Sequence, residues 1–142
     1  ALSNPGGAVY AVEMKGEAAE LIRRNREKFG AWNLVPVEGA APGALEELPA
    51  PDSVFIGGST GNMPEIFALI REKNPAARVV VSAISLETLA QAVDCFAKFG
   101  LQNTEISQIM AARAREAGRY HLMMGQNPVY LISGDFSEEQ ND

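Results

Sequence analysis

Short apolar runs alternate along the chain with segments in which apolar residues recur every three or four positions. The short runs predict strands over 9–12, 34–37, 54–56 and 79–81. The recurring positions predict helices over 17–29 and 63–73, a helix that follows Ser85, and a short helix around 44–48. After Gly100 the pattern predicts a strand over 102–110, an arginine-rich loop and a last strand over 129–133.

The helices have readable ends and apolar faces. Gly30 stops the first helix, and Ser85 has the side chain of an N-cap for the last one. The apolar positions are, in chain order, Ala18, Leu21, Ile22 and Phe29; then Ile66, Phe67 and Ile70; then Leu86, Leu89, Ala90, Val93 and Ala97. We expect the third set to form the buried stripe of its helix, and Cys95 to be a buried structural thiol.

The alternation of strand and helix indicates an α/β fold. Strand and helix alternate four times, which favours βαβ units and a parallel sheet, and two consecutive strands close the chain. The strands are apolar and β-branched, as in parallel sheets covered on both faces. We expect one domain over 1–136 and a flexible polar tail over 137–142.

Composition narrows the function classes. The chain has 142 residues and a net charge of −6, which argues against bulk binding of nucleic acid. One cysteine excludes an intrachain disulfide, and one histidine far from it in sequence leaves no credible metal site. No apolar run approaches the length of a membrane span, and no signal peptide is visible, so we expect a cytoplasmic protein.

Three predicted strand ends carry residues suited to a ligand, which in an open α/β sheet binds beyond the carboxyl ends of the strands. Glu13 is either an acceptor for both hydroxyls of a ribose or a solvated loop glutamate. The run Gly39-Ala40-Ala41 either leaves room for a flat ring or is a simple turn. The third strand end, at 57–62, is either a ligand site or a simple turn. Its glycines admit a ligand close to the backbone and its polar side chains add hydrogen bonds, whereas a turn alone needs fewer glycines. These residues are Gly57, Gly58, Ser59, Thr60, Gly61 and Asn62.

The segment 112–134 is the densest in cationic and hydrogen-bonding groups. It holds Arg113, Arg115, Arg119, Tyr120, the single histidine His121, and Asn127-Pro128. One interpretation is a solvated loop, with His121 a structural imidazole. The other is a lid that binds carboxylates or phosphates, because guanidinium groups pair with such anions in forked geometry. If the preceding strand continues to Arg115, Arg113 and Arg115 face the same side.

These segments resemble a known family. Val54-Phe-Ile-Gly-Gly-Ser59, Ser82-Ala-Ile-Ser-Leu-Glu87, and Ala112-Arg-Ala-Arg … Gly118-Arg-Tyr-His-Leu … Asn127-Pro-Val-Tyr-Leu-Ile132 are similar to the decarboxylating precorrin C-15 methyltransferases of cobalamin biosynthesis. That family belongs to the class I S-adenosylmethionine-dependent methyltransferases. The resemblance implies a Rossmann-like, mainly parallel sheet with an antiparallel C-terminal strand pair.

The resemblance also implies roles for residues. Glu13 would hold the ribose of S-adenosylmethionine, Met14 would lie near the adenine with Gly39, Ala40 and Ala41, and Gly57 and Gly58 would lie near the methionine part. The acceptor would be the C-15 meso carbon of a precorrin, whose ring C acetate is lost as carbon dioxide. Its carboxylates would meet Arg113, Arg115 and Arg119, with Thr60, Asn62 and Pro128 also in the substrate site. Candidates for catalysis are Ser59, Tyr120, His121 and Asn127, and we expect a homo-oligomer.

Two departures from the family pattern keep other functions open. An acidic residue usually stands where this chain has Ala40, and the family's first strand and glycine-rich cofactor loop should precede Ala1. We therefore expect a methyltransferase domain that is incomplete at its N-terminus. The alternatives are a methyltransferase for another small anionic substrate or for RNA, and a non-catalytic binding or assembly domain.

Overall fold

The computed structural model describes residues 6–58 and 61–137 and divides into two compact units, Ala1–Pro49 and Ala50–Asp142. The predicted tail lies outside the described residues apart from Ser137, as do Ser59 and Thr60. Within the described ranges no helix combines the length and the apolar composition needed to span a bilayer.

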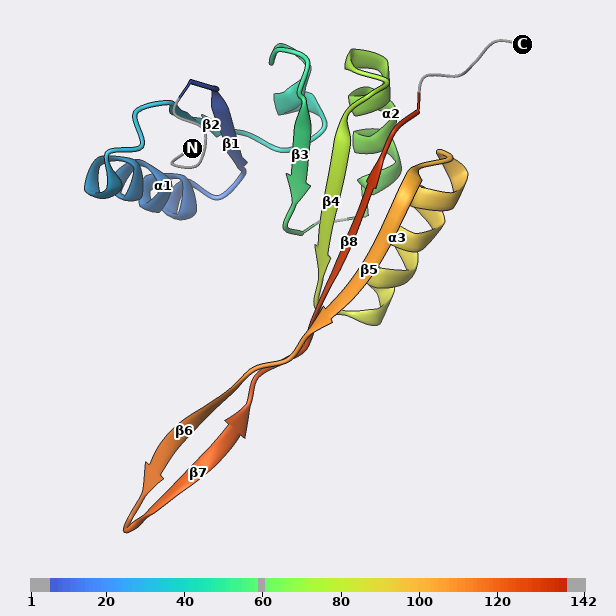
Figure 1. Ribbon diagram of the computed structural model, residues 1–142. Coiled ribbons are helices and arrows are strands. Elements are labelled where there is room, and N and C mark those ends of the chain that lie inside the picture. Colours follow the sequence, from blue (N-terminus) through green and yellow to red (C-terminus); the bar gives the residue numbers. More distant parts are fainter. Residues whose placement is uncertain (1–5, 59–60, 138–142) are drawn as a thin grey trace. The chain divides into compact units, whose positions relative to one another are not determined.

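The first unit is a single βαβ motif (Figure 1). Strands β1 (Val9–Glu13) and β2 (Leu34–Glu38) pair in parallel, and α1 (Gly16–Phe29) connects them. Helix α1 ends as predicted at Gly30, whose left-handed backbone (φ 62°) suits a residue without a side chain. The helix predicted around 44–48 is shorter, a 3-10 turn η1 (Gly43–Leu45), because prolines at 42 and 49 leave little room for regular helix.

The second unit is a four-stranded sheet with helices on one face (Figure 1). Its strands are β3 (Ser53–Ile56), β4 (Arg78–Ala83), β5 (Gln102–Ile109) and β8 (Val129–Asp135), in the order β3-β4-β8-β5. Strands β3 and β4 are parallel, and β8 runs antiparallel to both β4 and β5. This confirms the predicted parallel sheet with an antiparallel C-terminal pair.

Helices α2 (Met63–Lys73) and α3 (Leu86–Lys98) bury the core of this unit. Phe67 is fully buried, and its ring lies 5.6 Å from that of Phe96. The predicted N-cap is confirmed, since the Ser85 side chain accepts a hydrogen bond from the Thr88 amide (3.2 Å). Cys95 is buried as predicted, and burial raises the pKa of its thiol.

The predicted buried stripe of α3 is wrong. The residues that α3 buries are Ala92, Cys95 and Phe96, whereas Leu86 and Val93 are exposed. Ala90 and Ala97 are exposed as well, and of the predicted set only Leu89 is half-buried. Apolar residues occupy most of the circumference of α3, so two stripes fit the helical period, and the large Phe96 ring selects the one that meets Phe67.

The predicted arginine-rich loop is instead a β-hairpin, here called the arm. It consists of β6 (Ala112–Ala117) and β7 (Tyr120–Gly125), paired antiparallel and joined by a two-residue turn at Gly118 and Arg119. Gly118 has φ 63°, as such turns require. The Ala-Arg-Ala-Arg alternation at 112–115 has the strand period of two, a signal that the high charge density obscured.

Candidate active site

The first unit brings two predicted strand ends together. The Gly39 amide donates a hydrogen bond to the Glu13 carbonyl oxygen (3.1 Å), because β1 and β2 are parallel and end side by side. The Glu13 carboxylate accepts a hydrogen bond from the Lys15 amide (2.9 Å), which fixes its orientation at the end of β1. Met14 follows and is 54% exposed. A carboxylate and an exposed thioether therefore stand at the same edge as the Gly39 turn.

The glycine at 39 is required by packing. Its backbone has φ 157°, and a Cβ there would lie 2.9 Å from the Cβ of Ala44, which is closer than two carbon atoms can stand. The next residues, Ala40 and Ala41, are exposed and half-buried, and the Ala41–Pro42 peptide is cis. The small side chains leave an open surface beside the end of β2, as the flat-ring interpretation needs.

The second unit gathers another group of predicted residues at the carboxyl ends of β3 and β4. Gly57 and Gly58 follow β3, and a Cβ on Gly58 would meet nothing within 4 Å. Because Ala83 pairs with Tyr130 at the start of β8, Asn127 and Pro128 come to this same edge. Backbone and amide groups from two chain segments thus lie along one border of the sheet, here called the strand-end edge.

The loop before α2 is held in place at this edge. Asn62 precedes the first turn of α2, and its carbonyl oxygen accepts from the Ile66 amide (3.2 Å). The Gln91 side chain of α3 donates to the Gly61 carbonyl oxygen (3.2 Å). The predicted Ser59 and Thr60 lie in the part of this loop outside the described residues.

Sequence reasoning missed two apolar residues at the strand-end edge. Ile84 and Leu86 flank the cap residue Ser85 just after β4, and they are 70% and 72% exposed. Large aliphatic side chains bare at a strand end offer a contact for an apolar ligand surface. The available signal was the position of Ile84 directly after a buried strand, where a turn residue is the usual occupant.

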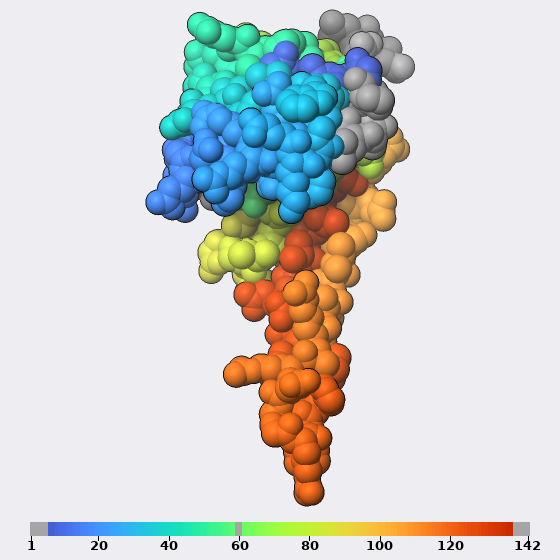
Figure 2. Space-filling model, turned by 90° about the vertical axis from the view of Figure 1, so that its left-hand side faces the viewer, coloured from blue at the N-terminus to red at the C-terminus, as the bar shows by residue number. Residues whose placement is uncertain are grey.

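The arm carries the arginines on one face. Arg113 pairs with Met124 across the hairpin and Arg115 pairs with Leu122, so the two guanidinium groups share a face, as strand alternation predicted. Arg119, in the turn, donates to the Tyr120 hydroxyl (2.9 Å) and lies 5.1 Å from the centre of its ring. Figure 2 shows the arm standing clear of the sheet and helices of its own unit.

Within one chain the arm separates Tyr120 and His121 from the strand-end edge. Tyr120 precedes Val129 by nine residues, which at about 3.3 Å per residue spans up to roughly 30 Å. His121 is exposed and lies 3.9 Å from the Glu116 carboxylate, a long and solvated contact. Asn127 therefore lies at the edge with Gly57 and Gly58, whereas Tyr120 and His121 lie near the tip of the arm.

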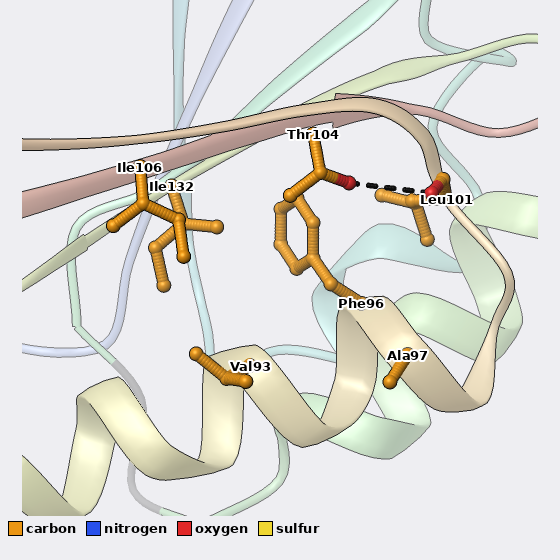
Figure 3. A pocket seen from close by; sticks show the side chains of 7 residues that line it. All are labelled: Val93, Phe96, Ala97, Leu101, Thr104, Ile106 and Ile132. Atoms are coloured by element: carbon orange, nitrogen blue, oxygen red, sulfur yellow. Dashed lines mark hydrogen bonds between the residues drawn. The ribbon is translucent and has the colours of Figure 1, made fainter.

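An apolar hollow between α3 and β5 is not a good candidate for the site (Figure 3). It encloses about 240 Å³ and is lined by Val93, Phe96, Ala97, Leu101, Thr104, Ile106 and Ile132. Its one polar side chain, Thr104, already donates to the Leu101 carbonyl oxygen (3.2 Å). The lining residues thus offer neither a charged group nor an amide, and we place the site at the strand ends instead.

Comparison with known proteins identifies relatives of this chain. A protein from Pyrobaculum calidifontis, called a probable cobalt-precorrin-6B C(15)-methyltransferase (decarboxylating), is 41% identical over 129 residues, which are 90% of this chain and 66% of that protein. The chain thus spans about two thirds of the length of this relative.

Solved structures show the same fold. A precorrin-6y C5,15-methyltransferase from Geobacter metallireducens matches with a TM-score of 0.82 at 34% identity, covering 94% of this chain and 70% of that one. A precorrin 8W decarboxylase from Methanobacterium thermoautotrophicum matches with a TM-score of 0.80 at 36% identity, covering 89% and 69%. The α/β fold is therefore the Rossmann-like fold of class I methyltransferases, as predicted. Since the model of the precorrin methyltransferase domain matches residues 1–134, the chain belongs to that family.

Proposed function

We propose that this chain provides most of an S-adenosylmethionine-dependent enzyme that methylates C-15 of a precorrin and removes the ring C acetate as carbon dioxide. The observation that carries the proposal is the 41% identity to a relative whose name states methylation at C-15 and decarboxylation. Residues 1–136 are proposed to form one methyltransferase domain, and the whole enzyme to include the further length that the relatives have.

S-adenosylmethionine fits the groups at the strand ends. The Glu13 carboxylate, an acceptor with two oxygens, suits the two hydroxyls of a ribose. Met14 and the small residues Gly39 to Ala41 offer a flat, partly apolar surface to an adenine. At Gly58 the open space beside the backbone admits the methionine part of the cofactor. When bound, the cofactor supplies an electrophilic methyl group on a sulfonium.

A precorrin fits the chemistry of the second unit. It is a flat, largely apolar macrocycle with carboxylates around its rim. Ile84 and Leu86 at the strand-end edge offer apolar contact, and Arg113, Arg115 and Arg119 offer charge-assisted hydrogen bonds to carboxylates. Thr60, Asn62 and Pro128 are proposed to complete the substrate site. A cluster of arginines in a chain of net charge −6 is thereby explained.

The protein's part in the reaction is alignment and proton handling. Holding the methyl donor and the acceptor carbon in line contributes on the order of 7–11 kcal/mol to lowering the barrier. Asn127, at the strand-end edge, is proposed to orient the substrate together with Ser59. Tyr120 or His121 is proposed to assist proton transfer as carbon dioxide leaves. Because both lie on the arm, this role needs a second copy of the chain, and we propose a homo-oligomer.

Transfer of a labelled methyl group tests the proposal. The protein at the length of its relatives is incubated with methyl-labelled S-adenosylmethionine and either a precorrin or RNA. We expect label in the tetrapyrrole and none in RNA. Label in RNA, or binding of S-adenosylhomocysteine without any transfer, would replace the proposal with an RNA methyltransferase or a non-catalytic domain.

A further inference from the structure

The loop between β3 and α2 has few side chains that could hold its backbone in one conformation. Three of its four described residues are glycines, namely Gly57, Gly58 and Gly61. A Cβ on Gly58 or Gly61 would meet nothing within 4 Å, so packing does not hold either residue. Glycine also loses more conformational freedom on folding than any other residue. A loop of this composition therefore needs a contact from another element.

Gln91 of α3 supplies such a contact. Its side-chain amide donates to the Gly61 carbonyl oxygen (3.2 Å), across thirty positions of the sequence. Gly61 has φ 96°, a conformation that residues with a side chain rarely adopt. Because the peptide group is planar, a bond to the Gly61 carbonyl oxygen also sets the direction of the Asn62 N–H. One side chain thus orients the peptide group that leads into α2.

Helix α3 is well anchored for this role. Its first turn is capped by Ser85, whose side chain accepts a hydrogen bond from the Thr88 amide (3.2 Å). Gln91 is half-buried, and the next residue, Ala92, is fully buried. Residues three and four apart share one face of a helix, so Gln91 lies on the same side of α3 as the buried Cys95. The bond therefore ties the loop to the packed core of the second unit.

The peptide group that Gln91 holds belongs to the proposed site. Gly57 and Gly58 are proposed to meet the methionine part of the cofactor, and Asn62 the substrate. A preorganised site binds more tightly, because less conformational freedom is lost on binding. Removal of the Gln91 bond would leave every group of the loop in the sequence and increase the freedom that the ligand must remove.

We propose that Gln91 is a positioning residue for the cofactor. By holding the Gly61 carbonyl oxygen, it keeps the loop between β3 and α2 in the conformation that receives the methionine part of S-adenosylmethionine. Gln91 acts through the loop and does not itself need to touch either reactant. The inference rests on the proposed function and adds to it a residue of α3, outside the strand ends.

Binding of S-adenosylhomocysteine by substituted proteins tests the inference. Gln91→Leu keeps most of the side-chain volume and removes the donor, and we expect it to weaken binding about two- to tenfold, the effect of one uncharged hydrogen bond. Gln91→Lys restores an N–H donor on a long side chain and should recover part of this loss. Titration calorimetry on the protein at the length of its relatives measures both, and urea unfolding shows that each variant is folded under these conditions.

Gln102→Leu is the matched control. The Gln102 side chain also donates to a glycine carbonyl oxygen, that of Gly100 (2.9 Å), and Gly100 also has a positive φ, of 66°. Gln102 pairs with Asp135, at the end of β8 opposite to the strand-end edge. Both leucine variants lose one hydrogen bond of the same kind, but only Gln91→Leu should bind S-adenosylhomocysteine more weakly.

Amide hydrogen exchange tests the hold on the loop without a ligand. The Ile66 amide donates to the Asn62 carbonyl oxygen (3.2 Å), at the start of α2. In Gln91→Leu this amide should exchange several times faster than in the wild type, because the residues before it are less restrained. Gln102→Leu should leave its exchange unchanged.

An affinity of Gln91→Leu equal to that of the wild type would overturn the inference and leave the bond with a purely structural role. Equal weakening in Gln91→Leu and Gln102→Leu would overturn it as well, by showing a general effect on the fold. Unchanged exchange of the Ile66 amide in Gln91→Leu would mean that Gln91 does not hold the loop. A wild-type protein that binds no S-adenosylhomocysteine would instead remove the proposed function, so the two failures are distinguishable.

Discussion

Arg113 and Arg115 show how one residue pattern combines charge and apolar surface. Their strand positions put them on one face of the arm, with Met124 and Leu122 directly opposite. A guanidinium beside an aliphatic or thioether side chain suits a ligand that has an apolar ring and carboxylates at its rim. Both arginines are exposed, so each contributes less than a buried cation would.

Replacing either arginine should weaken the binding of the substrate and leave the binding of the cofactor unchanged. A hydrogen bond to a charged group contributes about 1.5–3 kcal/mol, and exposure to solvent reduces this contribution. We therefore expect Arg113→Ala and Arg115→Ala each to raise the KM for the precorrin about three- to thirtyfold. The increase should shrink at higher salt, because exposed charges are screened. Steady-state kinetics at two ionic strengths measures this. Wild-type KM values in both variants would mean that these arginines do not bind substrate.

Glu13 is the residue on which the cofactor assignment most depends. Glu13→Ala should weaken binding of S-adenosylhomocysteine by about 1.5–3 kcal/mol, the loss of hydrogen bonds to a charged acceptor. Glu17→Ala, an exposed carboxylate in the first turn of α1, is the matched control and should bind normally. Titration calorimetry on the protein at the length of its relatives compares the two. Equal affinities would return Glu13 to the role of a solvated loop residue.

At the scale of elements, strong local signals made most of the fold predictable. Helix α2 has the predicted limits, and the strands predicted over 9–12, 34–37, 54–56 and 79–81 are each longer by only one to three residues. Apolar runs bounded by turns, and a cap such as Ser85, act within a few residues and need no tertiary context.

The elements that were predicted wrongly are those whose structure depends on contacts with distant parts of the chain. The buried face of α3 depends on the contact between Phe96 and Phe67. The arm depends on the pairing of β6 with β7, and the high charge of this segment made it resemble a loop in the sequence. The candidate site was predictable as strand ends, because parallel strands end at one edge. The separation of Tyr120 from that edge was not, since it follows from the arm's length. The role of Ile84 is likewise visible only once its exposure is known.

The stability that the pairing of β4 with β8 contributes should depend on pH. Arg78 and Asp135 face each other in register, with 2.8 Å between Nη1 and Oδ1, and the Asn103 side chain donates to the other carboxylate oxygen (3.1 Å). These bonds, from Asn103 first and then Arg78, lower the pKa of Asp135 below 3.8. Their stabilisation is therefore present above pH 3.8 and is lost as the pH falls through the lowered value.

Urea unfolding at two pH values tests whether the Asp135 carboxylate stabilises the fold in this way. Asp135→Asn should be less stable than the wild type near neutral pH, and the difference should narrow as the pH falls below 3.8. Asp94→Asn, on the exposed side of α3, serves as the control for removal of one negative charge. A stability difference that is constant with pH would show that the Asp135 carboxylate does not hold the two strands.

At the scale of the whole molecule, the proposed function divides between the two units. The first unit carries the residues proposed for the ribose and the adenine. The second carries those proposed for the methionine part, the substrate and its carboxylates. The chain belongs to the precorrin methyltransferase domain family, and the groups proposed for the two reactants are spread over both units. We propose that one enzyme adds a methyl group and removes a carboxyl group.

The mass of the tetrapyrrole product tests that claim most directly. The protein at the length of its relatives is incubated with S-adenosylmethionine and the precorrin, and the product is analysed by mass spectrometry. We expect a single product that has gained one methyl group in place of hydrogen and lost one carbon dioxide. A product that gains the methyl group and keeps every carboxyl group would contradict the decarboxylation, and an unchanged precorrin would contradict both proposed reactions.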